Sequence, residues 1–343
     1  RAAAAPALPL QLRAGPAASV IVEAAGVHVT VVSVAPGERE LLAPLVAPAL
    51  EALAPLGPVP VSSLRLIAGA RFLSDQPDAM PAALGDAILV PWTAVSPAAA
   101  PPAPRHLAAR SLARLWFGGV VPPGGHAAAT WWDAIAGYVA LWALSPDEAR
   151  AVRRGWIAAL SSSRAALPAA RYRGTVSSAV AGLLSGAAAP LLLVALEDRI
   201  GRDAMVAALR HLSTRRRGLP STWDDVLDAI AAAATRADAD WLRAWLDTPG
   251  VPDLQLRDIR FSEGTLRADL VQFVDRPFRG AVELALYRGA PRVGGGRVEY
   301  AAATLSTVTL PAPAGADRVV IDPDARVPRR VDLLASHLGG GGD

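Results

Sequence analysis

The residues of this chain whose types and spacing could do chemistry are gathered in two expected helices, at residues 105–138. His106, Arg110 and Arg114 recur at i, i+4 spacing, which places three polar side chains on one helix face. The second expected helix is almost wholly apolar, and Asp133 is its only charge. Burying an unpaired carboxylate is costly, so Asp133 needs a partner or must stay protonated. The arginines of the preceding helix are the nearest candidates.

The elements that must position these residues follow a clear order. Ahead of the two helices, the sequence predicts an apolar, Pro-interrupted helix at 38–56 and strands at 27–34, 64–73 and 87–92. Behind them it predicts helices at 145–160, 191–199, 203–212, 222–234 and 238–246. From 254 to 331, short alternating runs separated by turns predict an antiparallel β-sandwich of six or seven strands.

These elements predict an α+β protein. We expect a mixed α/β domain at residues 25–248, mainly helical in its second half, followed by the β-sandwich at 249–333. Residues 1–24 are expected to be a linker or a remnant strand, and the glycine-rich residues 334–343 a flexible tail. A length of 343 residues gives ample room for two domains.

Two helical segments carry further expectations. In the helix that starts after the cap Ser145, we expect Arg150, Arg153 and Arg154 to lie on a solvated face. Residues 175–196 carry no charge and are long enough to span a bilayer, but Ser, Gly and Pro dilute their apolarity. We therefore expect a buried helix pair broken near Gly186.

Composition excludes several classes of site. All 34 basic residues are arginine, the formal charge is only +3, and no basic stripe with interleaved aromatics indicates a nucleic-acid partner. The absence of cysteine excludes disulfides, thiolate metal ligands and a cysteine nucleophile. The five histidines are scattered along the chain, and no two of them have the spacing of metal ligands: His28, His106, His126, His211 and His337.

Motifs within the two central helices carry a family resemblance. Trp116-Phe117-Gly118 follows the first helix, and Asp133-Ala134-Ile135-Ala136-Gly137-Tyr138 begins after eighteen residues that follow Arg114. In these positions the chain resembles the zinc aminopeptidases of the gluzincin class, of the aminopeptidase N type. Their signature is H-E-x-x-H, then W-F-G, and then a third-ligand Glu in the context E-G-F-A-x-Y. The resemblance covers about residues 25–333 and implies a thermolysin-like domain.

The chain departs from that family where the chemistry lies. The H-E-x-x-H window falls on residues 110–114, so Arg110 and Arg114 stand where the resemblance implies zinc ligands and Ser111 where it implies the general base. A guanidinium offers only donors and cannot bind a cation, and a serine hydroxyl is too weakly basic to activate water unaided. Only the third-ligand position keeps a carboxylate, as Asp133.

The other catalytic positions implied by the resemblance are also altered. The family's G-A-M-E-N substrate loop would fall on Asp78-Ala79-Met80-Pro81-Ala82, which keeps Ala-Met and loses the Glu that holds the substrate's amino terminus. Asp78, Ala79 and Met80 are thus the candidate substrate-binding residues. The position of the catalytic Tyr falls at Gly186.

The resemblance and its departures together predict a degenerate member of this family, a pseudoenzyme with no metal and no cofactor. We expect it to bind protein partners as a scaffolding subunit of a larger, membrane-associated assembly at the periplasmic or extracellular face of the cell envelope. One alternative is a metallopeptidase or other hydrolase with an unorthodox site near Asp133 and Ser111. Another is a membrane-anchored subunit whose cleft binds peptides without cutting them.

The former metal site has two possible arrangements. In our hypothesis Arg110 and Arg114 converge on Asp133 and form a salt bridge where zinc would sit in the family. In the alternative, the arginines lie on an ordinary wet cleft wall and Asp133 bonds to backbone or water.

Overall fold

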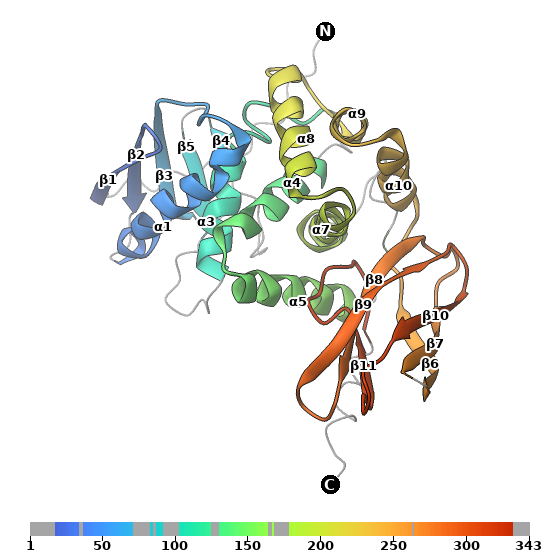
Figure 1. The fold of residues 1–343 in the computed structure, drawn as a ribbon. Coiled ribbons are helices and arrows are strands. Elements are labelled where there is room, and N and C mark those ends of the chain that lie inside the picture. The colour runs from blue at the N-terminus through green and yellow to red at the C-terminus, as the bar shows by residue number, and fades with distance from the viewer. Residues whose placement is uncertain are drawn as a thin grey trace.

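The computed structural model describes residues 18–33, 37–70, 83–84, 87–91, 103–124, 130–163, 167, 178–262 and 264–331. Along the chain, a five-stranded sheet with its helices is followed by a helical middle and then by strands near the C-terminus (Figure 1). The fold is therefore mixed α/β with antiparallel sheets in its last part, as the sequence predicted. The boundaries of the expected domains stay predictions.

The N-terminal sheet has the strand order β1-β2-β3-β5-β4. Its strands are β1 (Ala18–Ala24), β2 (Val27–Ser33), β3 (Ser63–Ala70), β4 (Ala83–Leu84) and β5 (Ala87–Pro91). The three inner strands are parallel to one another, and the two edge strands pair antiparallel. In β2, the alternation of Val27, Val29 and Val31 with more exposed residues buries one face of the strand. β1 lies in the segment for which we predicted a linker or a remnant strand.

Two helices join the sheet to the centre of the molecule. In α1 (Glu38–Leu53), Leu42, Val46 and Leu50 recur at helical spacing and are buried, and the short helix η1 (Ala54–Leu56) follows it. α1 packs against the N-terminal strands and against α3 (Ala103–Ala113), which also contacts β5. α3 is the first of the two helices that carry the candidate site.

The helical middle begins with the second of these helices. α4 (Trp131–Ala140) is buried along nearly its whole length and continues into the single turn η3 (Leu141–Ala143). α5 (Pro146–Ser162) starts with a capping box, in which Ser145 accepts from the backbone of Glu148 and the Glu148 side chain accepts from the backbone of Ser145. The sequence predicted this start.

The expectation of a helix pair broken near Gly186 is wrong. α6 (Ser178–Leu183), the π-helical turn η4 (Leu184–Ala188) and α7 (Ala189–Ile200) follow one another without a break. The amide of Ala189 donates to the carbonyl of Leu184, so the wider turn takes in an extra residue and the helix continues. Residues 180–200 are long and apolar enough to cross a membrane, but 67% of their most apolar window is buried inside the protein, as in a core helix.

Three helices complete this region, namely α8 (Arg202–Arg215), α9 (Trp223–Ala233) and α10 (Arg236–Asp247). Thr222 and Thr235 cap the last two by accepting from amides in the first turn. These bounds lie within three residues of the predicted ones.

The C-terminal strands form two three-stranded antiparallel sheets, in the orders β10-β7-β6 and β11-β8-β9. Their strands are β6 (Leu254–Ser262), β7 (Thr265–Gln272), β8 (Gly280–Tyr287), β9 (Arg292–Tyr300), β10 (Leu305–Pro311) and β11 (Arg318–Ile321). Leu266 and Leu270 on one sheet and Leu284 and Leu286 on the other belong to one buried apolar cluster. The predicted count of six or seven strands agrees with these six.

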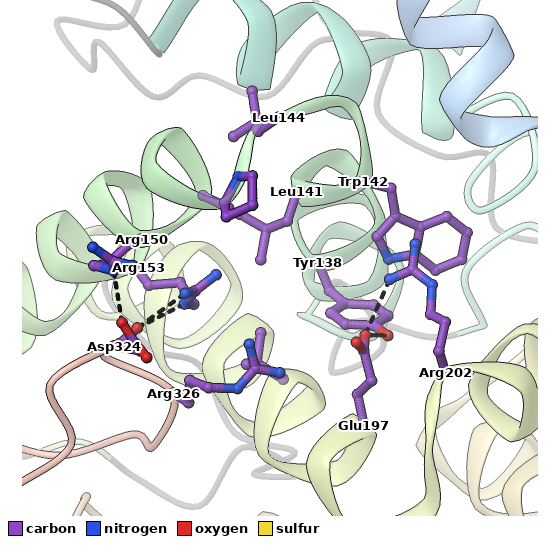
Figure 2. Close-up of a pocket in the computed structure, with 13 residues that line it drawn as sticks. Tyr138, Leu141, Trp142, Leu144, Arg150, Arg153, Glu197, Arg202, Asp324 and Arg326 are labelled. Carbon is purple, nitrogen blue, oxygen red and sulfur yellow. Dashed lines mark hydrogen bonds and ion pairs between the residues drawn. The ribbon is translucent and has the colours of Figure 1, made fainter. Parts of the chain in front are cut away.

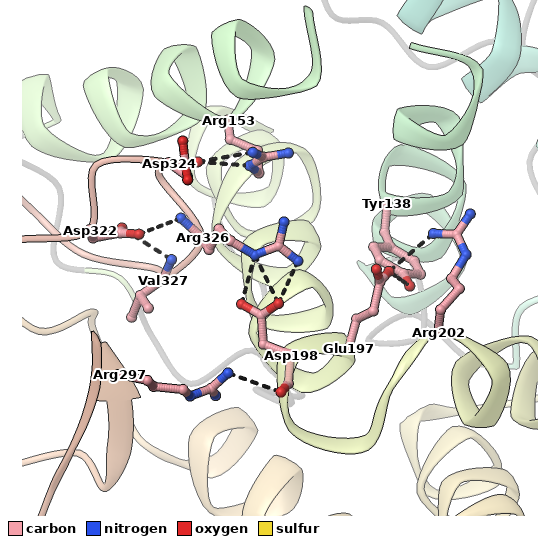
Figure 3. A network of polar contacts seen from close by, with 10 residues as sticks. All are labelled: Tyr138, Arg153, Glu197, Asp198, Arg202, Arg297, Asp322, Asp324, Arg326 and Val327. Atoms are coloured by element: carbon pink, nitrogen blue, oxygen red, sulfur yellow. Dashed lines mark hydrogen bonds and ion pairs between the residues drawn. The ribbon is translucent and has the colours of Figure 1, made fainter. Parts of the chain in front are cut away.

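Two adjacent carboxylates at the end of α7 tie these regions together (Figure 3). Glu197 accepts from the hydroxyl of Tyr138 on α4 and from Nη1 of Arg202 on α8. Asp198 accepts from Arg326, in the loop after β11, with a closest N···O distance of 2.5 Å. The backbone carbonyl of Asp198 also accepts from Arg297 on β9. One helix end therefore contacts both the helical middle and the C-terminal strands.

Candidate functional site

A tight turn after α3 brings α3 and α4 together. The amide of Gly118 donates to the carbonyl of Val121 at 2.9 Å, and Gly118 has a φ of +116°, which other residues rarely adopt. A Cβ atom at Gly118 would lie 3.0 Å from the ring of Trp132, so α4 also packs closely over this position. The Trp-Phe-Gly element of the sequence is therefore a turn that sets the distance between the two helices.

The centre of the candidate site is the carboxylate of Asp133, which is fully buried. Arg110 binds this carboxylate in a bidentate manner, with Nε 3.1 Å from Oδ1 and Nη2 2.5 Å from Oδ2. Nη2 of Arg114, whose side chain is 1% exposed, donates to Oδ1. The predicted convergence of the two arginines on Asp133 is confirmed. The alternative of a wet cleft wall is wrong for this carboxylate.

The charges in this cluster fix each other's protonation. Burial alone would raise the pKa of Asp133, but the charges and hydrogen bonds of Arg110 and Arg114 outweigh it and hold that pKa below its ordinary value. Burial, together with the like charge of Arg110, lowers the pKa of Arg114 to about 10, although Asp133 opposes this change. At neutral pH the cluster therefore holds one carboxylate and two guanidinium cations.

Two glycines lie beside the guanidinium of Arg110. A Cβ atom at Gly186, in η4, would lie 3.9 Å from Nη2 of Arg110, and one at Gly137, in α4, would lie 3.9 Å from Nε. The structure thus places Gly186, the expected position of a lost tyrosine, beside the cluster. Sequence reasoning missed the contribution of Gly137. Its signal is a glycine inside an apolar helix, one turn after Asp133.

Arg114 has a second neighbour in Trp132. Its guanidinium carbon lies 4.9 Å from the centroid of a Trp132 ring, within the range of a cation–π contact. The aromatic face adds to the stabilisation of a charge that has been removed from water.

His106 lies one turn before Arg110, and it too is buried. Its Nε2 is 3.0 Å from the carbonyl oxygen of Gly137, and its ring packs edge-on against Trp156 at 5.5 Å. Burial, and next the charge of Arg110, lower the pKa of His106 to about 4, so the ring is neutral at physiological pH. His106 is a satisfied core histidine that joins α3 to α4.

Ser111 is directed away from the carboxylate. Its hydroxyl donates to the carbonyl of Leu107 at 2.7 Å, which is the usual bond of a serine to the preceding turn of its own helix. The candidate substrate-binding residues Asp78, Ala79 and Met80 lie outside the described residues.

The donor set at this site does not fit zinc. A zinc site of this type needs neutral imidazoles and a carboxylate with free lone pairs. Here two cations occupy the ligand positions, and both oxygens of Asp133 already accept hydrogen bonds from them. In the part of the chain that the structure describes, no group of three or more His, Cys, Asp or Glu residues could hold a metal ion.

Comparison with known proteins gives a relative by fold. No family model and no curated protein sequence matches the chain. Among solved structures, the chain is similar to aminopeptidase A of Legionella pneumophila, in complex with aspartic acid, with a TM-score of 0.74 at 11% sequence identity. The match covers 93% of this chain and 38% of the Legionella chain. The chain therefore has an aminopeptidase-like fold and spans well under half the length of that neighbour.

Proposed function

We propose that this chain is a catalytically inactive protein of the zinc aminopeptidase type, a binding or scaffolding subunit of a larger assembly. The finer assignment, to the aminopeptidase N-type gluzincins with a thermolysin-like domain, rests on the motif positions around Arg110 to Tyr138. The observation that carries the proposal is the closed cluster of Arg110, Asp133 and Arg114.

Such a cluster takes over the structural part of a metal's role. A zinc ion held by two residues of one helix and one of the next cross-links the two helices. Two guanidiniums on one carboxylate cross-link α3 and α4 in the same way, through a hydrogen-bonded ion pair in a low-dielectric interior. The fold of a catalytic domain can then persist after the catalytic residues are lost, and the surface of that domain remains available for binding.

The competing proposal is a hydrolase with an unorthodox site, and the geometry offers it little support. A general base needs a free lone pair and a pKa near the working pH. The pKa of Asp133 lies below its ordinary range, and both of its oxygens accept from arginines. A serine nucleophile needs an adjacent base, whereas the Ser111 proton is committed to the carbonyl of Leu107.

Metal content and peptidase activity test the proposal. Purified protein dialysed against zinc is expected to hold far less than one equivalent of metal and to leave aminoacyl substrates uncut. A variant carrying Arg110→His, Ser111→Glu, Arg114→His and Asp133→Glu restores the ligands and the base that the resemblance implies. It is expected to bind about one zinc per chain, because three ligands then converge on one point.

The matched control is Arg215→His, which sets a second histidine four residues after His211, at the same i, i+4 spacing on the exposed face of α8. It is expected to bind zinc much more weakly than the restored site, since it supplies two ligands in place of three. Stoichiometric zinc or chelator-sensitive turnover in the unaltered protein would overturn the proposal of inactivity.

The partner and the location belong to the same proposal. We propose that the chain binds protein partners at the periplasmic or extracellular face of the cell envelope. Cross-linking in intact cells, followed by purification through a tag on this chain, is expected to recover a defined membrane-associated complex of fixed stoichiometry. Recovery of the chain alone from the cytoplasm would contradict this placement.

A further inference from the structure

A second polar site lies away from the Asp133 cluster. A cavity of about 360 Å³ opens between α4 with η3, α5, the end of α7, and the loop after β11 (Figure 2). This volume is within the range of sites that hold small molecules. The cavity shares no lining residue with the cluster, and neither the resemblance nor the proposed function assigns it a role.

The two sides of the cavity differ in chemistry. Leu141 and Leu144 form an apolar part of the lining, whereas the Glu197–Arg202 pair lies against Tyr138 and Trp142, with the Arg202 guanidinium carbon 3.6 Å from the centroid of a Trp142 ring. Figure 2 shows Arg150, Arg153 and Asp324 grouped on the opposite side, with Arg326 near them. A molecule that filled the cavity would therefore meet the hydrocarbon of Leu141 and Leu144 and, beside it, the guanidinium groups of Arg150, Arg153 and Arg326.

The cavity lining as a whole carries more cations than its carboxylates can pair. Glu197 is bound by Arg202 at 3.1 Å, and Asp324 by Nε of Arg150 at 2.6 Å. Arg326 is paired with Asp198, which lies outside the cavity lining. These pairings use every carboxylate of the lining, which leaves one guanidinium to account for.

That guanidinium belongs to Arg153. The sequence predicted a solvated Arg153, and this prediction is wrong, since the residue is only 6% exposed. Its Nε and Nη2 donate to the backbone carbonyl of Asp324 at 3.1 and 3.0 Å. Within the described ranges it forms no ion pair with a carboxylate. A buried cation without a counterion is costly, and the loop of Asp324 covers this one.

The neighbouring charges sharpen the point. Burial, and next the like charge of Arg326, lower the pKa of Arg153 to about 10 against the opposing charges of Asp324, Asp322 and Asp198, so the group is still a cation at neutral pH. The guanidiniums of Arg153 and Arg326 repel each other at the wall of the cavity. An oxyanion bound between them would stabilise both through charge-assisted, bidentate hydrogen bonds.

We propose that this cavity binds a small amphipathic anion, with a carboxylate or phosphate headgroup at Arg153 and Arg326 and an apolar body against Leu141 and Leu144. The headgroup supplies a direct ion pair, which Arg153 does not form with any carboxylate of the described residues. The apolar body removes the side chains of Leu141 and Leu144 from water. The site is independent of the pseudoenzyme proposal, because it shares no residue with the zinc-type position.

Isothermal titration with four probes tests the ligand class. Octanoate and octyl phosphate carry the two headgroups on the same chain, inorganic phosphate lacks the apolar body, and octylamine carries the opposite charge. One equivalent of octanoate or octyl phosphate is expected to bind, at least about tenfold more tightly than inorganic phosphate or octylamine, and the tighter of the two identifies the headgroup. Octylamine binding as tightly as the anions, or no binding of either amphipathic anion at millimolar concentration, would overturn the proposal.

Matched variants locate the site. Arg153→Met keeps the length of the side chain and removes its charge, and is expected to weaken binding about tenfold or more. Arg154→Met is the control, because Arg154 is the next residue of α5, is exposed, bonds the carbonyl of Pro323 and does not line the cavity. It is expected to change affinity less than about twofold.

A second variant guards against misfolding of Arg153→Met. Ala149→Leu adds bulk at a buried lining position and changes no charge, so it is expected to block binding by filling the cavity. Circular dichroism of each variant reports whether it folds. Unchanged affinity in a folded Ala149→Leu variant, or in a folded Arg153→Met variant, would place the ligand elsewhere and end the proposal.

Discussion

The Asp133 cluster and the Arg153 cavity lie on the same helical framework, yet they treat buried arginine in opposite ways. At Asp133, two guanidiniums share one carboxylate that is fully buried. At Arg153, the hydrogen bonds to described residues go to one backbone carbonyl, and the guanidinium borders an open volume. A buried charge that carries its own counterion closes a site, whereas one without a counterion leaves a site that a ligand can complete.

The largest expected effect breaks the closed cluster. Asp133→Asn keeps the shape of the side chain but leaves two arginines facing each other in the interior. Removing one partner of a buried ion pair costs about 3–5 kcal/mol, so we expect a loss of this order in the free energy of unfolding, measured by urea denaturation. Replacing all three residues by apolar ones, Arg110→Met, Arg114→Met and Asp133→Leu, is expected to restore most of it. An Asp133→Asn variant as stable as the unaltered protein would contradict the picture of a closed site.

The next largest effect is the dependence of the free energy of unfolding on acidic pH. The folded protein holds His106 neutral with a pKa of about 4, against 6.5 for the free side chain. Because the folded pKa is the lower one, this contribution to stability is fully present above pH 6.5. It is lost as pH falls toward 4, by about 3 kcal/mol. His106→Gln is expected to flatten the stability profile between pH 6.5 and 4, in denaturant melts at several pH values.

The control for that profile is His211→Gln, since His211 is exposed on α8. Below pH 4 the unfolding free energy is expected to fall further, because the folded pKa of Asp133 lies below its unfolded value and its protonation releases the two arginines. A profile that keeps its slope between pH 6.5 and 4 without His106 would assign that slope to other groups.

A third measurement sharpens the contrast between the closed and the open site. At a ligand concentration of about 100 times Kd, octanoate or octyl phosphate is expected to stabilise the protein by about 2.7 kcal/mol, seen as a rise in Tm. Arg153→Met is expected to abolish this shift. Its own stability is expected to change by less than about 1 kcal/mol, because the charge that it removes has no buried carboxylate partner. A loss as large as that of Asp133→Asn would show that the two arginine sites do not differ.

The smallest effect comes from a pair of charges without burial. Arg236 and Asp240 face each other at 3.5 Å on α10, and both side chains are more than half exposed. Asp240→Asn is expected to change the unfolding free energy by about 0.5 kcal/mol or less, measured by the same urea denaturation. A larger loss would mean that ion pairing itself, and not burial, sets the scale of the effects above.

The sequence predicted a site better when the residues that form it lie close together along the chain. The Asp133 cluster could be predicted because Arg110 and Arg114 share a helix face and the next helix offers a single carboxylate. The burial of Arg153 could not, because the loop that covers it, at Asp324, lies 171 residues further on. A local pattern of three arginines in α5 is the same whether a distant loop covers the helix or water does.

The helical elements show the same limit. Caps at Ser145 and Thr222 mark where helices begin, and these starts were predicted. Gly186 was interpreted as a break because glycine weakens a helix, but packing against neighbouring helices holds the chain in a π turn there. Tertiary contacts determine that the helix continues through Gly186, and such contacts cannot be predicted from a local run of small residues.

The paired carboxylates that end α7 have a mechanical consequence. Glu197 is fastened to α4 and α8, whereas Asp198 is fastened to β9 and to the loop after β11 (Figure 3). Neighbouring residues of one rigid helix cannot move independently, so a force that tilts the C-terminal strands is transmitted through Asp198 to Glu197 and then to Tyr138. Tyr138 stands five residues after Asp133 in α4 and lines the cavity. A partner that pulls on the C-terminal sheets would thus strain both arginine sites at once.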